Sequence, residues 1–128
     1  MSTPLPSFPD IEAALLDLLA PLVATGHVGT TTPTDLAGTL PFIRLDVFSG
    51  TDDLITDTSR VAVDVFAAKR SDGIPLAEQV RQTIIAYPHV IGSVIIDRAG
   101  TLTRPAETPW DGTGVRRWSA TYTVSARR

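Results

Sequence analysis

The chain has 128 residues and a formal net charge of −3, with 43% apolar and 20% charged residues, and this length fits a single domain over residues 1–128. This charge balance builds no basic stripe that would bind nucleic acid, and no apolar run approaches the roughly 20 residues of a membrane span. The absence of cysteine excludes disulfides, thiolate metal sites and a cysteine nucleophile.

Residues 1–8 are rich in proline and serine and are predicted to form a flexible N-terminal arm. A helix is expected next, with Ser7 as its cap and Pro9 in its first turn. Apolar residues then recur at helical spacing, at Ile11, Leu15, Leu18, Leu19 and Leu22. Because Pro21 lies inside this pattern, the helix is expected to end near Ala20 or to bend there.

The segment from Gly26 to Pro41 is rich in threonine, glycine and proline. A connection of this length with no structure of its own is uncommon in a compact domain. It either contains a short edge strand around residues 27–32 or is an extended segment that becomes ordered only against a partner.

Alternating apolar residues predict strands over Phe42–Phe48 and Arg60–Ala68. The polar and acidic segment Ser49–Ser59 is predicted to be the long loop of an antiparallel hairpin between them. After a turn, a second helix is expected to begin at Pro75 and to end before Pro88. The rest of the chain is predicted to be a strand over Val90–Arg98, a turn at Ala99-Gly100, a long loop over Thr101–Val115 and a last strand over Arg116–Ala126.

Each predicted helix and strand has one apolar face, and their order is helix, strand, strand, helix, strand, strand. This order predicts an α+β fold in two layers, with a mostly antiparallel four-stranded sheet and two helices packed on one face. On the last strand, Ser119, Thr121, Thr123 and Ser125 alternate with the apolar residues, so one face of that strand is expected to be core and the other to be wet.

The second face of the predicted sheet mixes aromatic with charged side chains, and it is too apolar to lie in water as one patch. Either the long loops fold over this face, or it is a subunit interface. Trp110, in a loop rich in proline and glycine, is similarly either an interface anchor or a residue folded back onto the core. The residues that mix on this face are Phe42, Phe48 and Phe66 with Arg44, Asp46 and Asp64.

The acidic residues Asp52, Asp53 and Asp57 are the best candidates for a metal site. Their predicted loop lacks the glycine and the closing glutamate of a calcium loop, so a solvated acidic loop is the preferred interpretation. His27 and His89 have no second ligand at metal spacing. The chain has no nucleophile elbow and no glycine-rich phosphate cradle. We therefore expect no enzymatic activity, no metal and no cofactor.

Five segments of the chain form a recognisable series, namely Pro9-Asp10-Ile11-Glu12-Ala13-Ala14-Leu15-Leu16-Asp17-Leu18-Leu19, Leu40-Pro41-Phe42-Ile43-Arg44-Leu45, Arg60-Val61-Ala62-Val63-Asp64-Val65-Phe66-Ala67, Leu76-Ala77-Glu78-Gln79-Val80-Arg81 and the run from Arg117 to Arg127. No segment is diagnostic alone, but their order, their spacing and the total length resemble the tail terminator proteins of long-tailed bacteriophages, in particular those of actinobacteria.

The resemblance implies a virion protein, made in the host cytoplasm, that forms a homohexameric ring on the tail tube at the head-proximal end of the tail. The ring would end tube polymerisation and dock to the head connector, so its partners would be itself, the major tail tube protein and the head–tail connector proteins. Two alternatives remain: a head–tail connector or neck ring protein of the same phage, and a small ligand-binding module or enzyme. The candidate interface residues are Phe42, Arg44, Asp46, Phe48, Asp52, Asp53, Asp57, Asp64, Phe66, Trp110, Asp111, Arg116 and Arg117.

Overall fold

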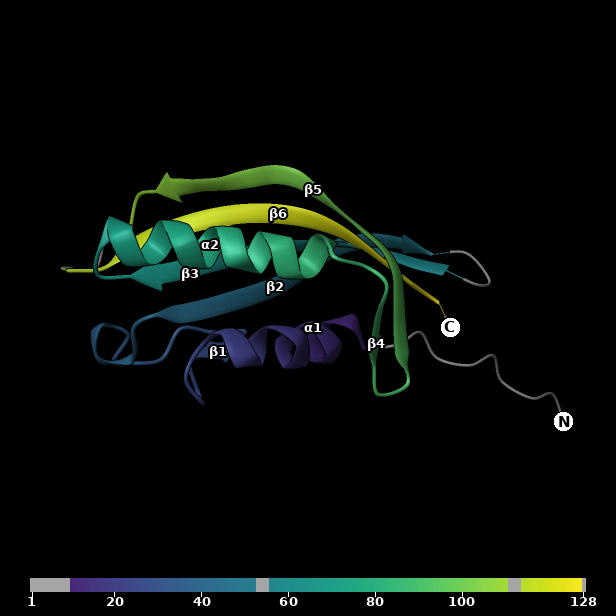
Figure 1. Ribbon diagram of the computed structural model, residues 1–128, viewed down its shortest axis with the longest axis horizontal. Coiled ribbons are helices and arrows are strands. Elements are labelled where there is room, and N and C mark those ends of the chain that lie inside the picture. Colours follow the sequence, from purple (N-terminus) through teal and green to yellow (C-terminus); the bar gives the residue numbers. More distant parts are fainter. Residues whose placement is uncertain (1–9, 53–55, 111–113, 128) are drawn as a thin grey trace, which may run out of the picture.

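A computed structural model of the protein describes residues 10–52, 56–110 and 114–127. Figure 1 shows a long curved sheet with two helices beside it. In chain order the elements are α1 (Ile11–Leu19), the 3-10 turn η1 (Ala20–Leu22), β1 (Val28–Gly29), the 3-10 turn η2 (Ala37–Thr39), β2 (Phe42–Asp52), β3 (Thr56–Ala67), α2 (Arg70–Ile85), β4 (His89–Ile91), β5 (Val94–Thr108) and β6 (Arg116–Arg127).

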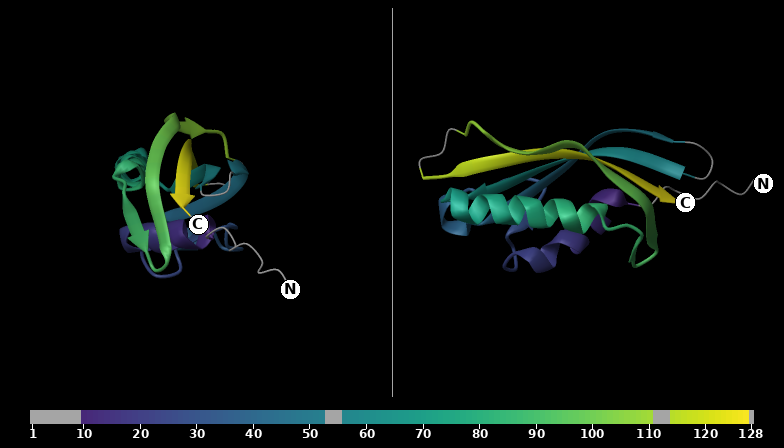
Figure 2. Two further views of the ribbon diagram at one scale, coloured as in Figure 1. Left: turned by 90° about the vertical axis from the view of Figure 1, so that its right-hand side faces the viewer. Right: turned by 45° about the horizontal axis from the view of Figure 1, so that its top comes forward.

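The sheet has six strands in the order β1-β2-β3-β6-β5-β4, so the prediction of a four-stranded sheet was wrong. It is also mixed, because β1 pairs with β2 in parallel while every other pair is antiparallel. The sheet curls into a half-barrel around the helices, and both helices lie on its concave side (Figure 2). The predicted strand Val90–Arg98 is divided by a turn at Gly92-Ser93 into β4 and the beginning of β5. β1 and β4 are short edge strands, each paired with a long neighbour.

The concave face of the sheet forms the main core, as the alternation in the sequence predicted for β3 and β6. Val61, Val63 and Val65 of β3 are buried. On β6 the same face carries Trp118, Ala120, Tyr122, Val124 and Ala126. The apolar stripes of the helices close this core with Ile11, Leu15 and Leu19 from α1 and Leu76, Val80 and Ile84 from α2.

The two helices begin at residues other than those predicted. Asp10, not Ser7, caps α1, and its Oδ1 accepts a hydrogen bond of 3.0 Å from the amide of Ala13; Ser7 lies outside the described residues. The end of α1 at Leu19 confirms the effect expected of Pro21, which lies in η1. Pro75 lies inside α2 and not at its start.

The start of α2 was predicted too late because the first turn is stabilised by contacts that periodicity does not reveal. The amides of Asp72 and Gly73 donate hydrogen bonds of 3.1 and 3.0 Å to the carbonyl oxygen of Lys69. Gly73 also packs directly on the indole of Trp118, a residue far along the chain. This tertiary contact holds a helical turn in a segment that the sequence marks as a turn.

Two predicted loops are largely strands. β5 continues without a turn at Ala99-Gly100 and ends at Thr108, so most of the predicted loop over Thr101–Val115 is strand. It pairs with β6 through three register shifts, and these bulges explain why no regular alternation marks it. Likewise β2 and β3 extend far into Ser49–Ser59. Of the two alternatives for the segment from Gly26 to Pro41, the structure has the short edge strand, as β1. In the described part of the chain, neither helix has the length and apolar character needed to cross a membrane.

Candidate functional site

A second, smaller cluster of apolar residues lies on the convex face of the sheet. Phe42 of β2 and Phe66 of β3 are cross-strand partners and are buried, with 3% and 0% of their surfaces exposed. Val115, just before β6, completes the buried part. Leu36 and Leu40 from the segment around η2 and Trp110 after β5 pack over it. The connecting segments therefore fold over this end of the convex face, which was one of the two arrangements predicted for it.

Trp110 is held by aromatic and cationic neighbours. Its ring meets the ring of Phe66 edge to face, with 4.8 Å between centroids and 69° between planes. The guanidinium carbons of Arg44 and Arg117 lie 5.6 and 5.2 Å from the Trp110 ring centroid. Arg44 also lies 5.3 Å from the Phe66 centroid. Both distances to Trp110 are within the range of cation–π attraction, so the loop tryptophan is fixed against the sheet.

A chain of polar contacts crosses the convex face beside this cluster. Nε of Arg44 donates to Oδ2 of Asp64 over 3.1 Å, and the hydroxyl of Ser119 donates to Oδ1 of the same carboxylate. The hydroxyls of Ser119 and Thr108 lie 3.0 Å apart. Nε of Arg117 donates to the hydroxyl of Thr108 over 2.8 Å. The contacts join β2, β3, β6 and β5 and satisfy the charged groups that burial would otherwise penalise.

The structure divides the candidate residues into two groups. Phe42, Arg44, Asp64, Phe66, Trp110 and Arg117 belong to the packed cluster and its polar contacts. Asp46 and Phe48 are exposed on β2, and Arg116 is exposed while paired with Glu107 at 2.8 Å. Asp57 pairs with Asp52 in the register of β2 and β3. Asp53 and Asp111 lie outside the described residues.

Hydroxyl groups occupy the convex face of β6 from Ser119 to Ser125, in agreement with the pattern read on the last strand. Thr58 of β3 and Ser125 of β6 place their hydroxyl oxygens 3.1 Å apart. Thr121 and Thr123 lie between Ser119 and Ser125 on the same strand face and are half-buried. This surface is polar and uncharged along β6.

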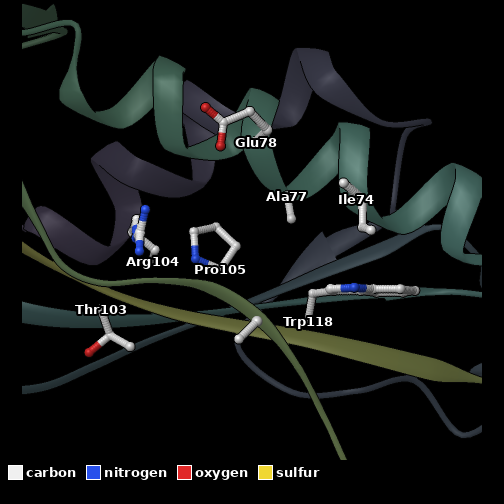
Figure 3. Close-up of a pocket in the computed structure, with 8 residues that line it drawn as sticks. Ile74, Ala77, Glu78, Thr103, Arg104, Pro105 and Trp118 are labelled. Atoms are coloured by element: carbon white, nitrogen blue, oxygen red, sulfur yellow. The ribbon is translucent and has the colours of Figure 1, made fainter.

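A groove of about 490 Å³ opens between α2 and the bulged part of β5. Ile74 and Ala77 point from α2 toward Trp118, and Pro105 points from β5 toward the helix (Figure 3). Glu78 and Arg104 stand near the groove, while Thr103 points away from the helix. The polar side chains do not converge on one point of the groove, so they do not form a site for a specific ligand.

The carboxylate of Glu78 is occupied by a neighbour on its own helix. Nε of Arg81 lies 3.0 Å from each of the two carboxylate oxygens. These hydrogen bonds lower the pKa of Glu78, so the group stays ionised and is a poor proton donor. Among the described residues, no group of three or more histidine and acidic side chains could hold a metal ion.

Sequence reasoning missed Ser119 and Thr108 as links in the polar chain, and it missed the exposed residues Leu102 and Arg104 on β5. Thr108, Leu102 and Arg104 lie in the segment that was predicted to be a loop, so no facing direction could be assigned to them. The hydroxyl of Ser119 was placed on the correct face, but its acceptor, Asp64, depends on the register between β3 and β6.

Comparison with known proteins gives a match at the level of structure. No protein family model matches the chain, and no curated protein matches it in sequence. A chain from the virion of a native gene transfer agent particle has a similar fold, with a TM-score of 0.67 and 19% sequence identity. The alignment covers 92% of this chain and 95% of that chain. At this identity the match establishes a common fold over nearly the whole of both chains.

Proposed function

We propose that this protein is a structural component of a virion and forms a ring at the head-proximal end of a tail tube. In this role it ends the polymerisation of the tube and presents a docking surface to the head connector. The observation that carries the proposal is the fold that it shares, over 92% of its length, with a chain of a gene transfer agent virion. The resemblance of its segments to tail terminators supports the finer assignment.

The surface of the molecule supports a role in assembly. In the described part of the chain, ion pairs occupy the carboxylates of Asp64, Glu78, Asp97 and Glu107, and the groove beside α2 lacks converging polar groups. The described residues therefore show no arrangement of side chains suited to catalysis. A ring needs two different patches on each subunit, because cyclic assembly uses heterologous contacts. The two opposite edges of an open sheet are different surfaces of this kind.

The partners that follow from the proposal are other copies of the chain, in a homohexameric ring, the major tail tube protein and the head–tail connector proteins. In solution, without tube, we expect a monomer or a weak oligomer. Mass measurement with and without assembled tubes tests this, and a tight twofold dimer as the sole assembly contradicts the ring.

Deleting the gene from the virus or particle-forming element that carries it, followed by electron microscopy of the lysate, tests the assigned role. Overlong tails are the expected result, because an uncapped tube continues to polymerise. Tails of normal length that remain unattached to heads assign the protein to the neck and contradict the terminator role. Restoring the intact gene is the control, and it must restore both tail length and head attachment.

A further inference from the structure

Both edges of the sheet contain a length of strand with no neighbour among the described residues. β1 pairs with β2 at Ile43 and Arg44 alone, which leaves Leu45–Asp52 open on its outer side. At the other edge, β4 pairs with β5 at Val94–Ile96, which leaves Asp97–Thr108 open. Open strand edges present unpaired backbone donors and acceptors, and these template pairing with another strand.

The directions of the four long strands allow the sheet to continue into a second copy. The sheet order runs β2, β3, β6, β5, and each neighbouring pair is antiparallel, so β2 and β5 run in opposite directions. If a second copy is placed beside the first in the same orientation, its β2 lies next to β5 of the first copy, and the two strands are antiparallel. Antiparallel pairing is slightly more stable per residue than parallel pairing.

The backbone of β2 is oriented for this contact. The amide of Ile43 donates a hydrogen bond of 2.9 Å to the carbonyl oxygen of His27, on the outer side of β2. Because alternate residues of a strand direct their amides to the same side, Leu45 and Val47 direct theirs to the same outer edge. The open part of β2 therefore begins with donors that a neighbouring strand could use.

The side chains on the two open edges are complementary. Phe48 and Leu102 belong to the large apolar side chains that the fold leaves exposed, each with 52% of its surface accessible, and one lies on each open edge. Asp46 and Arg104 are also exposed, and neither takes part in an ion pair within the described residues. Asp46 on one edge and Arg104 on the other thus carry opposite charges.

An antiparallel pairing of the two edges brings Phe48 of one copy beside Leu102 of the next. Both residues lie at register irregularities, between Val47 and Ser49 in β2 and between Thr101 and Thr103 in β5. Arg104 lies at the groove on the helix side of β5, whereas Asp46 lies on the convex face of β2, so the two charges attract along the contact without being directly opposed.

We propose that copies of this protein associate through the open edge of β2 (Leu45–Asp52) in one subunit and the open edge of β5 (Asp97–Thr108) in the next. The interface is heterologous, so it propagates from copy to copy and closes into a ring when the curl of the sheets brings the last copy to the first. The inference rests on the proposed ring and names its lateral contact. The bulges in both edges and Pro105 in β5 limit this pairing to short stretches of backbone.

The lack of cysteine permits a direct test of this contact. Phe48→Cys and Leu102→Cys are made as separate variants, mixed and oxidised. The expected product is a disulfide dimer containing one of each variant, because opposed residues of neighbouring antiparallel strands lie within disulfide range. Because the bond traps transient encounters, weak association still accumulates product. The double variant should give a series of covalent multimers beyond the dimer.

The matched control is a mixture of Phe48→Cys with Val90→Cys, since Val90 is 73% exposed and pairs with Ile95, outside the open stretch Asp97–Thr108. Mixed product at the control rate overturns the proposal. So does a preference of Phe48→Cys for its own copies, because that product reveals a twofold contact.

Charge reversal gives a second readout on the same contact. Asp46→Arg should weaken self-association by about threefold, and adding Arg104→Asp should restore it, because opposite charges on the two edges attract. Loss in the single variant without recovery in the double variant contradicts the pairing of these two edges. Cross-linking and mass report on the lateral contact, whereas tail length in the deletion experiment reports on the terminator role, so either can fail while the other holds.

Discussion

Gly73 and Trp118 are so close that a β-carbon on Gly73 would stand 2.0 Å from Cζ3 of the indole. Nonbonded carbon atoms do not approach so closely, so the first turn of α2 can lie on β6 in this position only while residue 73 has no side chain. Trp118 is 3% exposed and belongs to the main core, and Gly73 is buried against it. This contact sets how closely α2 approaches the sheet.

Gly73→Ala is therefore expected to destabilise the protein by about 1–3 kcal/mol, because the methyl group must displace the helix or the indole. This loss comes despite the gain of about 1 kcal/mol in helix propensity from glycine to alanine. Urea denaturation followed by circular dichroism measures the change. Gln79→Ala, at an exposed position of the same helix, is the control and should leave stability nearly unchanged. If Gly73→Ala is as stable as Gln79→Ala, the close packing of Gly73 on Trp118 is contradicted.

Trp110→Ala removes the ring that covers Phe66 and leaves the guanidinium groups of Arg44 and Arg117 without their aromatic neighbour. Trp110 is half-buried, so we expect a loss of about 1–3 kcal/mol, which is below the cost of truncating a fully buried tryptophan. Thermal unfolding measures it. Trp110→Phe keeps an aromatic face and should recover a large part of the loss. If Trp110→Ala unfolds at the same temperature as the wild type, Trp110 does not stabilise the cluster.

Asp64→Ala should also lower stability, by about 1–3 kcal/mol, because it leaves Arg44 without its carboxylate and Ser119 without its acceptor. A double-mutant cycle with Arg44→Ala isolates the coupling between the two charged groups. Asp17→Ala, at an exposed position of α1, is the matched control and should have little effect. Additive losses in the cycle are the result that rules out coupling.

Tyr122 differs from the residues above, because removing its hydroxyl should not destabilise the protein. The side chain is 0% exposed, and its hydroxyl has no hydrogen-bond partner among the residues that the structure describes. Tyr122→Phe relieves this unpaired polar atom and should leave stability equal or raise it by up to about 1 kcal/mol. Tyr87→Phe, at an exposed position, serves as control. A clear loss in Tyr122→Phe reveals a partner for the hydroxyl in solution.

The same tyrosine predicts a pH dependence in alkaline solution. Burial raises the pKa of Tyr122 from 10.0 to about 12. Between these values the unfolded chain releases the phenolic proton while the folded protein retains it, so the stability contribution of the neutral phenol is lost as pH rises through this window. Tyr122→Phe should lack this part of the decline. If wild type and Tyr122→Phe lose the same amount of stability across this pH range, the prediction is wrong.

The elements that could be predicted from the sequence are those whose pattern depends on one buried face. Alternation in β3 and β6 identified the core residues of both strands, and Pro21 marked the end of α1, because burial and a missing amide are local properties of the chain. The mixture of aromatic and charged residues around Phe66 was also visible, and it offered two interpretations. The register between strands was needed to choose the covered cluster.

The tertiary structure alone decided the length of β5, the start of α2 and the two open edges. β5 has no regular alternation because bulges shift its register, so its strand conformation depends on pairing with β6. The first turn of α2 depends on Gly73 meeting Trp118, residues far apart in the chain. The relation between Phe48 and Leu102 is of the same kind, because strand order places them on opposite edges of the sheet, and no local pattern contains that order.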